Sequence, residues 1–199
     1  MAKKINRQSD VVNTYQEDGQ FILMGRADFL KWITELEVER EITLLQQHHT
    51  YIPNYDNFDG DNHFSLGKAM KRSHLKRGFS DIAQNITTYP DGTIMICRDF
   101  ETKPAGIKGK NFGALCLEHV GHFDLDCDEI TKEHEKTILF VNAVLCMKFN
   151  LKPSAALIYH TWYASKSCPG TNFFGGNTRE DCAKNFVPMV ESMMEVLDA

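Results

Sequence analysis

The spacing of hydrophobic and polar positions divides this chain into short strands and amphipathic helices. In residues 27–39, apolar side chains recur every three or four positions, which predicts a helix with Asp28 as its N-terminal cap. Residues 131–150 show the clearest helical pattern, with Thr131 as cap and acidic residues in the first turn. Residues 65–78 read as a further helix that ends at a glycine.

Between these helices lie several β-prone segments. Residues 41–50 are apolar and end in two adjacent histidines, and residues 81–89 and 94–100 flank a Pro-Asp-Gly-Thr turn typical of a hairpin. Residues 114–123 are apolar enough for a strand buried on both faces, and residues 154–160 form a short strand. The order of elements predicts one α/β domain, a central mixed β-sheet flanked by helices.

The two ends of the chain differ from this pattern. The first twenty residues show no periodicity, so we expect residues 1–40 to form an arm and a short helix packed on a domain of residues 41–199. The tail, residues 177–199, has helical apolar spacing, and Pro188 should kink this helix or restart it.

Charge and hydropathy exclude several classes of partner. The chain has 199 residues and a net charge of -5, and its basic residues are scattered, which argues against nucleic acid. The basic run at residues 68–77 is typical of a solvated helix face. No apolar run approaches membrane-spanning length, and the first residues lack the apolar core of a secretory signal. We therefore expect a soluble chain, made in the cytoplasm, with no membrane partner.

The cysteines are spaced irregularly in a chain too large to need disulfide bonds, so we expect mostly free thiols. Cys116 and Cys146 lie in apolar segments and read as core residues, whereas Cys168 lies in a turn among polar neighbours. The six are Cys97, Cys116, Cys127, Cys146, Cys168 and Cys182.

Candidate metal ligands come from two places in the sequence. The stretch YHTWYASKSCPG (159–170) holds His160 eight positions before Cys168, and the strand at 41–50 delivers His48 and His49 to its end. Two histidines and one cysteine would suit a zinc ion that keeps a fourth position open. From the residues alone, packing in the core for His160 and Cys168, and a surface or capping position for the histidine pair, is the favoured interpretation.

The candidate metal ligands belong to a series of four motifs along the chain. They are HHT (48–50), DIAQNITTYPDGTI (81–94), LEHVGHFD (117–124) and YHTWYASKSCPG (159–170). Over residues 41–175 the chain resembles the zinc-dependent N-acetylmuramoyl-L-alanine amidases of phage endolysins and bacterial autolysins, a family that includes the peptidoglycan recognition proteins. The resemblance implies that His48, His160 and Cys168 bind Zn²⁺ and that His49 supports them or packs beside them.

The resemblance also implies a reaction and a partner. Residues 41–199 would be a zinc amidase catalytic domain that uses a zinc-activated water to cleave the amide between N-acetylmuramic acid and L-alanine in bacterial peptidoglycan. Glu118 would accept a proton and Lys166 would stabilise the transition state. Without the resemblance, Glu118 could equally be an ion-paired or edge residue of its apolar strand. Lys166 alone would be interpreted as a solvated loop lysine.

One departure from the family pattern keeps other functions open. Many relatives carry Gly-Tyr-His after Asp-Ile, and the tyrosine is assigned a catalytic role; here Ala83, Gln84 and Asn85 stand there. This favours the branch that uses a strand glutamate, and it leaves room for a non-catalytic peptidoglycan-binding module. A cysteine hydrolase with Cys168 as nucleophile and His160 as base is a third reading, which the Pro-Gly after the cysteine argues against.

Two further expectations follow. The remaining histidines match no ligand position and should lie at the surface or in loops; they are His63, His74, His119, His122 and His134. Because no signal peptide is recognised, the resemblance points to a phage endolysin that accumulates in the cytoplasm and acts on the cell wall after release.

Overall fold

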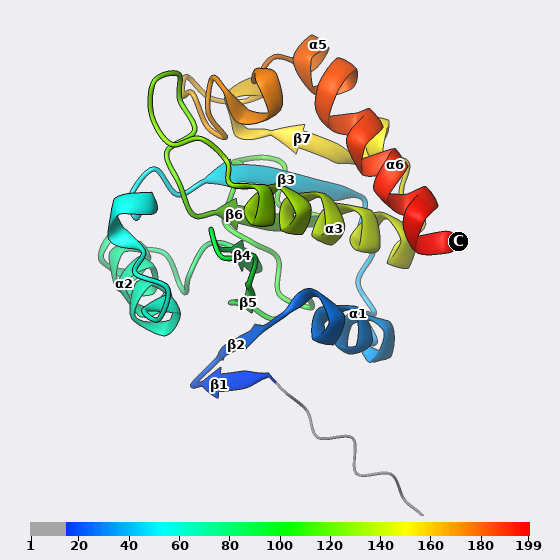
Figure 1. Cartoon of the computed structure of the whole chain (residues 1–199). Coiled ribbons are helices and arrows are strands. Elements are labelled where there is room, and N and C mark those ends of the chain that lie inside the picture. The colour runs from blue at the N-terminus through cyan, green and yellow to red at the C-terminus, as the bar shows by residue number, and fades with distance from the viewer. Residues whose placement is uncertain (1–14) are drawn as a thin grey trace, which may run out of the picture.

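A mixed seven-stranded sheet runs through the computed structural model, which describes residues 15–199 (Figure 1). The strand order is β1-β2-β5-β4-β6-β3-β7. The pairs β1–β2, β2–β5 and β5–β4 are antiparallel, and the pairs β4–β6, β6–β3 and β3–β7 are parallel. The strands are β1 Gln16–Asp18, β2 Phe21–Met24, β3 Leu44–His49, β4 Ile86–Thr88, β5 Ile94–Ile96, β6 Ala114–His119 and β7 Leu157–Tyr159. The predicted α/β class with a central mixed sheet is confirmed.

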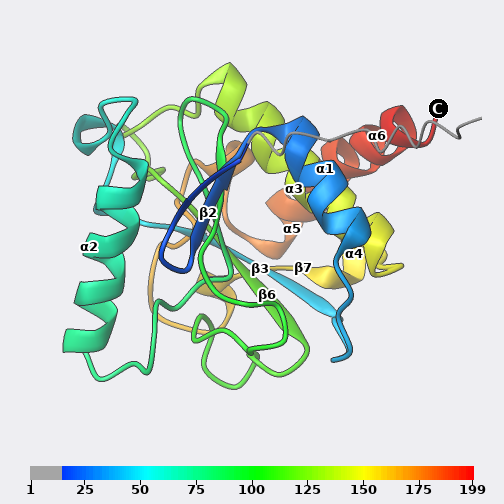
Figure 2. The ribbon, with the colours of Figure 1, turned by 90° about the horizontal axis from the view of Figure 1, so that it is seen from below.

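Helices cover both faces of this sheet. Figure 2 shows α2 on one side of the strands and α1, α3 and α6 on the other. Each face has its own apolar cluster, the smaller between α2 and the sheet and the larger beneath α3 and α6. The helices are α1 Arg26–Glu35, α2 His63–Lys76, α3 Lys132–Lys148, α4 Pro153–Ala156, α5 Arg179–Asp181 and α6 Val187–Asp198.

Local chemistry explains most helix ends. Thr131 caps α3 as predicted, because its side chain accepts a hydrogen bond from the backbone N–H of His134. The predicted cap of α1 is wrong: Gly25 occupies the cap position and Asp28 lies within the first turn. A π-helical turn, Cys182–Phe186, leads directly into α6 with helical dihedrals at Phe186 and Val187, so Pro188 follows a local irregularity inside one continuous helix.

The N-terminal part of the chain belongs to the sheet more than its sequence indicates. Residues 1–14 of the expected arm lie outside the described residues. Residues 16–18, also expected in that arm, form the edge strand β1, which pairs with β2, and β2 pairs with β5.

None of the helices in residues 15–199 combines the length and apolar composition needed to cross a bilayer.

Four of the five histidines expected at the surface are in fact buried, namely His63, His74, His119 and His134; His122 is half-buried. The expectation failed because these rings have partners inside the fold, such as Asp91 beside His63 at 2.8 Å. All six cysteines are free thiols, as predicted, and Cys116 and Cys146 are buried.

His119 and His134 belong to one directed chain of hydrogen bonds through the core. Gln47 Oε1 can only accept, so His119 donates to it from Nε2 at 3.0 Å. The Nδ1 of His119 then accepts from the Thr88 hydroxyl at 2.8 Å, and Thr88 Oγ1 accepts from His134 Nε2 at 2.7 Å. The Tyr55 hydroxyl completes the chain by donating to His134 Nδ1 at 2.9 Å. This pattern requires both imidazoles to be neutral.

Candidate metal centre

The parallel strands bring the candidate side chains to one edge of the sheet. His48 lies near the end of β3 in direct register with Glu118 on β6, and His160 follows the last residue of β7. Carboxyl ends of parallel strands meet at the same edge, which explains why residues so distant in sequence converge. Cys168 reaches the same place from the loop after His160.

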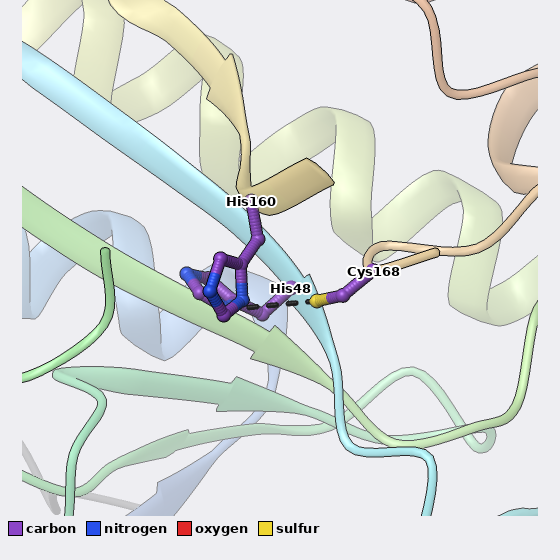
Figure 3. Close-up of side chains that lie close together, drawn as sticks. All are labelled: His48, His160 and Cys168. Carbon is purple, nitrogen blue, oxygen red and sulfur yellow. Dashed lines mark hydrogen bonds between the residues drawn. The ribbon is translucent and has the colours of Figure 1, made fainter. Parts of the chain in front are cut away.

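The three predicted ligands form one cluster. Their ligand atoms all lie within 4.8 Å of one another, and Figure 3 shows the side chains of His48, His160 and Cys168 converging. Cys168 Sγ is 3.5 Å from His48 Nδ1, and the two imidazole centroids are 4.6 Å apart. Tetrahedral zinc with bonds of about 2.0 Å to nitrogen and about 2.3 Å to sulfur separates such atoms by roughly 3.5 Å. The donor set and its spacing therefore fit zinc.

The protonation of the two histidines also suits a metal. Burial, helped by the neighbouring His160, holds the pKa of His48 well below its usual value, and burial lowers the pKa of His160 to about 4. Both rings are therefore neutral near pH 7 and have a lone pair to offer. Burial raises the pKa of the Cys168 thiol, so a positive charge is needed to stabilise its thiolate.

The back of His48 is closed by the loop that precedes β6. Its Nε2 is buried and has no hydrogen-bond partner among residues 15–199. A Cβ on Gly106 would lie 3.0 Å from that nitrogen and would overlap the side-chain oxygen of Gln46. Only a glycine therefore fits this close approach, and Nδ1 is the nitrogen that faces Cys168.

A cavity of about 640 Å³ opens over this cluster, and Glu118 and Lys166 line it together with the three ligands. Glu118 is half-buried; burial raises its pKa to about 7, against the opposing charges of Arg77 and Lys166. Lys166 is exposed, which leaves its ammonium group able to move over the cavity. Every site residue predicted from the sequence thus borders one hollow.

The sequence did not predict that certain other residues line the cavity. His49 lines it too, and its Nδ1 accepts the backbone N–H of Phe123 at 3.2 Å, so it does not join the cluster. His74 and Arg77 also line the cavity, although the sequence of their segment is typical of a solvated helix face. No local signal identifies them, because the direction in which α2 faces is set by packing.

The structure also bears on the tyrosine position of relatives and on the cysteine-hydrolase alternative. Gln84, which stands where relatives carry a tyrosine, is buried and donates to Thr87 Oγ1 at 3.0 Å, outside the cavity lining. For a cysteine nucleophile, the ring nitrogen within hydrogen-bonding distance of Cys168 belongs to His48, and His160 has no hydrogen bond to the thiol in the described structure. Cys168 also lies in a loop and lacks a helix N-terminus to lower its thiol pKa.

Comparison with known proteins identifies solved structures with a similar fold. No protein-family model and no curated protein matches the chain. The amidase LysC of Clostridium intestinale matches with a TM-score of 0.58 and 23% identity over 73% of this chain and 85% of that one. Drosophila PGRP-LB matches with a TM-score of 0.60 and 19% identity over 72% of this chain and 87% of that one.

A third structure, of the peptidoglycan recognition protein PGRP-LE in complex with tracheal cytotoxin, matches with a TM-score of 0.60 and 22% identity. The match covers 69% of this chain and 79% of that one. Identities at this level establish the fold. The chain therefore has the fold shared by N-acetylmuramoyl-L-alanine amidases and peptidoglycan recognition proteins.

Proposed function

We propose that this chain is a zinc-dependent N-acetylmuramoyl-L-alanine amidase that removes stem peptides from bacterial peptidoglycan. The observation that carries the proposal is the cluster of His48, His160 and Cys168 at the base of a cavity that Glu118 also lines. A set of three ligands that leaves one coordination position open is typical of catalytic zinc sites. Purely structural zinc sites are closed by a fourth protein ligand.

The roles of the remaining residues follow from their positions. His48, His160 and Cys168 would hold the zinc ion, which would supply Lewis-acid chemistry near neutral pH. Glu118 accepts the proton of the attacking water and passes it to the leaving amine. Lys166 places its ammonium group near the oxyanion that develops on the carbonyl oxygen.

The substrate class rests on the comparisons together with this site. One of the similar structures is described as an endolysin amidase, and the PGRP-LE structure holds a monomeric diaminopimelic acid-type peptidoglycan. We propose the same partner here, and a lytic role of the phage endolysin type in which the protein acts on the wall after its release. Neither nucleic acid nor a membrane is part of this proposal.

A comparison of two inhibitors tests the proposal. Incubation with a chelator should abolish the clearing of purified cell walls, and added zinc should restore it. An alkylating agent should inhibit the zinc-loaded protein more slowly than the chelated protein, because bound zinc would protect Cys168, although the buried thiol with its raised pKa should react slowly in both. Inhibition by the alkylating agent together with indifference to the chelator would instead indicate a cysteine hydrolase.

A second candidate, a non-catalytic peptidoglycan-binding module, is favoured by Gln84. The residue is buried and bonded within the fold, so it cannot act as the tyrosine of relatives does. Such a module would sediment with insoluble peptidoglycan and release no soluble product. Sedimentation and product release measured on the same sample separate the two functions.

A further inference from the structure

A second carboxylate, Asp124, lies beside the candidate metal centre. It binds the loop that carries Lys166 and Cys168. Its Oδ1 accepts the backbone N–H of Thr171 at 2.9 Å, and its Oδ2 accepts the hydroxyl of Ser167 at 2.9 Å. Ser167 is the single residue between Lys166 and Cys168. One side chain thus fastens this loop on both sides of the cysteine.

The neighbours of Asp124 fasten the same loop through its backbone. Leu125 donates its N–H to Thr171 Oγ1 at 2.8 Å, and Asn172 donates its N–H to the carbonyl of Phe123 at 2.9 Å. Gly170 packs so closely that a Cβ there would overlap the Phe123 carbonyl, and its φ of +125° is a conformation that favours glycine. The segment 123–125 therefore acts as a fixed template for the loop.

The opposite side of the loop is joined to the other ligand segment. The carbonyl of Cys168 accepts the N–H of Thr161 at 2.7 Å, next to His160. Asn177 Nδ2 donates to the carbonyl of Ser167 at 2.7 Å. With Asp124 on one side and these bonds on the other, the Cys168 backbone is held at a set distance from His160.

The arrangement of Asp124, Ser167 and His122 is not that of a hydrolytic triad. His122 Nε2 lies 3.0 Å from Oδ2 of Asp124, the same oxygen that accepts from Ser167. In a triad the histidine stands between the acid and the hydroxyl and takes its proton. Here the serine hydroxyl is committed to the carboxylate, and His122 helps to orient that carboxylate. Asp124 is an anchor for the loop.

We propose that Asp124 is a positioning residue that presets the Cys168 sulfur and the Lys166 backbone for zinc binding and for turnover. The inference rests on the proposed zinc site. Hydrogen bonds to a carboxylate are stronger than those between neutral groups, so the anchor restricts a loop that would otherwise sample many conformations. Residues that orient metal ligands from outside the coordination shell commonly affect metal affinity by about 10- to 100-fold.

Zinc affinity, measured on the intact chain by competition with a chelator of known strength, tests this role without reference to hydrolysis. Asp124→Ala should weaken zinc binding by about 10- to 100-fold. Asp124→Asn should fall between Asp124→Ala and the unmodified chain, because an amide oxygen can still accept from Thr171. Asp126→Asn is the matched control, since Asp126 is exposed, lies two residues away and has no hydrogen bond to the described residues. It should bind zinc normally.

A double-mutant cycle separates the anchor from general destabilisation. Ser167→Ala removes only one of the bonds to Asp124 and should weaken zinc binding by less than Asp124→Ala. In the Asp124→Ala background the same change should have almost no further effect, because residues that share an interaction are not additive. Full additivity in the cycle would contradict the anchor.

The results of these experiments distinguish a failure of the positioning role of Asp124 from a failure of the proposed amidase function. If Asp124→Ala fails to fold, Asp124→Asn and Ser167→Ala carry the test, and unchanged zinc affinity in both overturns the inference. If the chain binds zinc and the Asp124 variants weaken it while no wall product is ever released, the positioning role stands and the proposed reaction falls. A chain that binds no zinc overturns both.

Discussion

His48 and His49 are adjacent and chemically identical, but successive side chains of a strand point to opposite faces, so the two rings make different contacts. His48 lies beside Cys168 in the cluster that lines the cavity, whereas the ring of His49 accepts a backbone N–H from Phe123. The family resemblance, carried by four motifs in one order, was enough to identify the members of the cluster. It could not reveal His74, whose position depends on how α2 packs, or the burial of His119, whose partners lie on other strands.

Metal content tests the ligand set residue by residue. We expect about one zinc per purified chain, because the cluster offers three ligands to one ion. His48→Ala, His160→Ala and Cys168→Ser should each lose most of it, and elemental analysis by mass spectrometry would measure the loss. His49→Ala is the matched control and should retain its zinc. Stoichiometric zinc in all three ligand variants would refute the assignment.

Turnover tests the two charged residues separately from the metal. Glu118→Gln and Lys166→Ala leave the three ligands in place, so both should bind zinc normally. Their rates on peptidoglycan should fall by roughly 10²-fold or more, the usual scale for losing a general base or an oxyanion partner. Gln84→Ala serves as comparison and should keep its turnover per folded molecule. Full activity in Glu118→Gln with none in Gln84→Ala would mean that the base has been misassigned.

Among the elements, those with strong patterns were predicted and the short polar ones were not. The core strands β3 and β6, the β4–β5 hairpin and helix α3 all follow from hydrophobic spacing and turn residues. Strand β1 consists of three polar residues at the sheet edge, so nothing in its sequence alternates. The predicted strand at residues 154–160 begins instead with the helical turn α4, because Pro153 favours the start of a helix.

The loop before β6 gives a prediction at this scale. Gly106→Ala would push a methyl group against His48 Nε2 and the Gln46 side chain. We expect a loss of about 1–3 kcal/mol in the free energy of unfolding, as for other overpacked sites, together with weaker zinc binding. Gly25→Ala is the comparison, because an added methyl there meets nothing within 4 Å and the variant should lose only the difference between glycine and alanine at the cap of α1. Equal urea-unfolding midpoints for the two variants would show that the loop can move away freely.

For the molecule as a whole, the buried histidines link stability to pH. Burial lowers the pKa of His134 to about 3, and burial also holds the pKa of His119 well below its usual value. The unfolded chain binds protons near pH 6.5 whereas the folded chain resists them. Stability is therefore complete above about pH 6.5 and is lost as the pH falls toward 3. Protonation would also reverse the hydrogen bonding that joins Tyr55 to Gln47.

Urea unfolding between pH 7.5 and 5 measures this linkage. Each such histidine should lower the free energy of unfolding by up to about 1.4 kcal/mol per pH unit once the pH is below 6.5. His134→Gln should be less stable at pH 7.5 because it loses the hydrogen bonds to Tyr55 and Thr88. Its stability should nevertheless fall less steeply with acid. A slope identical to that of the unmodified chain would show that His134 is not the group being titrated.

The most direct test of the central claim is mass spectrometry of the soluble products after the zinc-loaded chain digests purified peptidoglycan. The proposed reaction predicts free stem peptides that begin with L-alanine, with the glycan strands left uncut and their muramic acid carboxyl groups free. Addition of a chelator should stop their release. Products cut within the peptide or the glycan, or no product from any wall tested while zinc remains bound, would contradict the account.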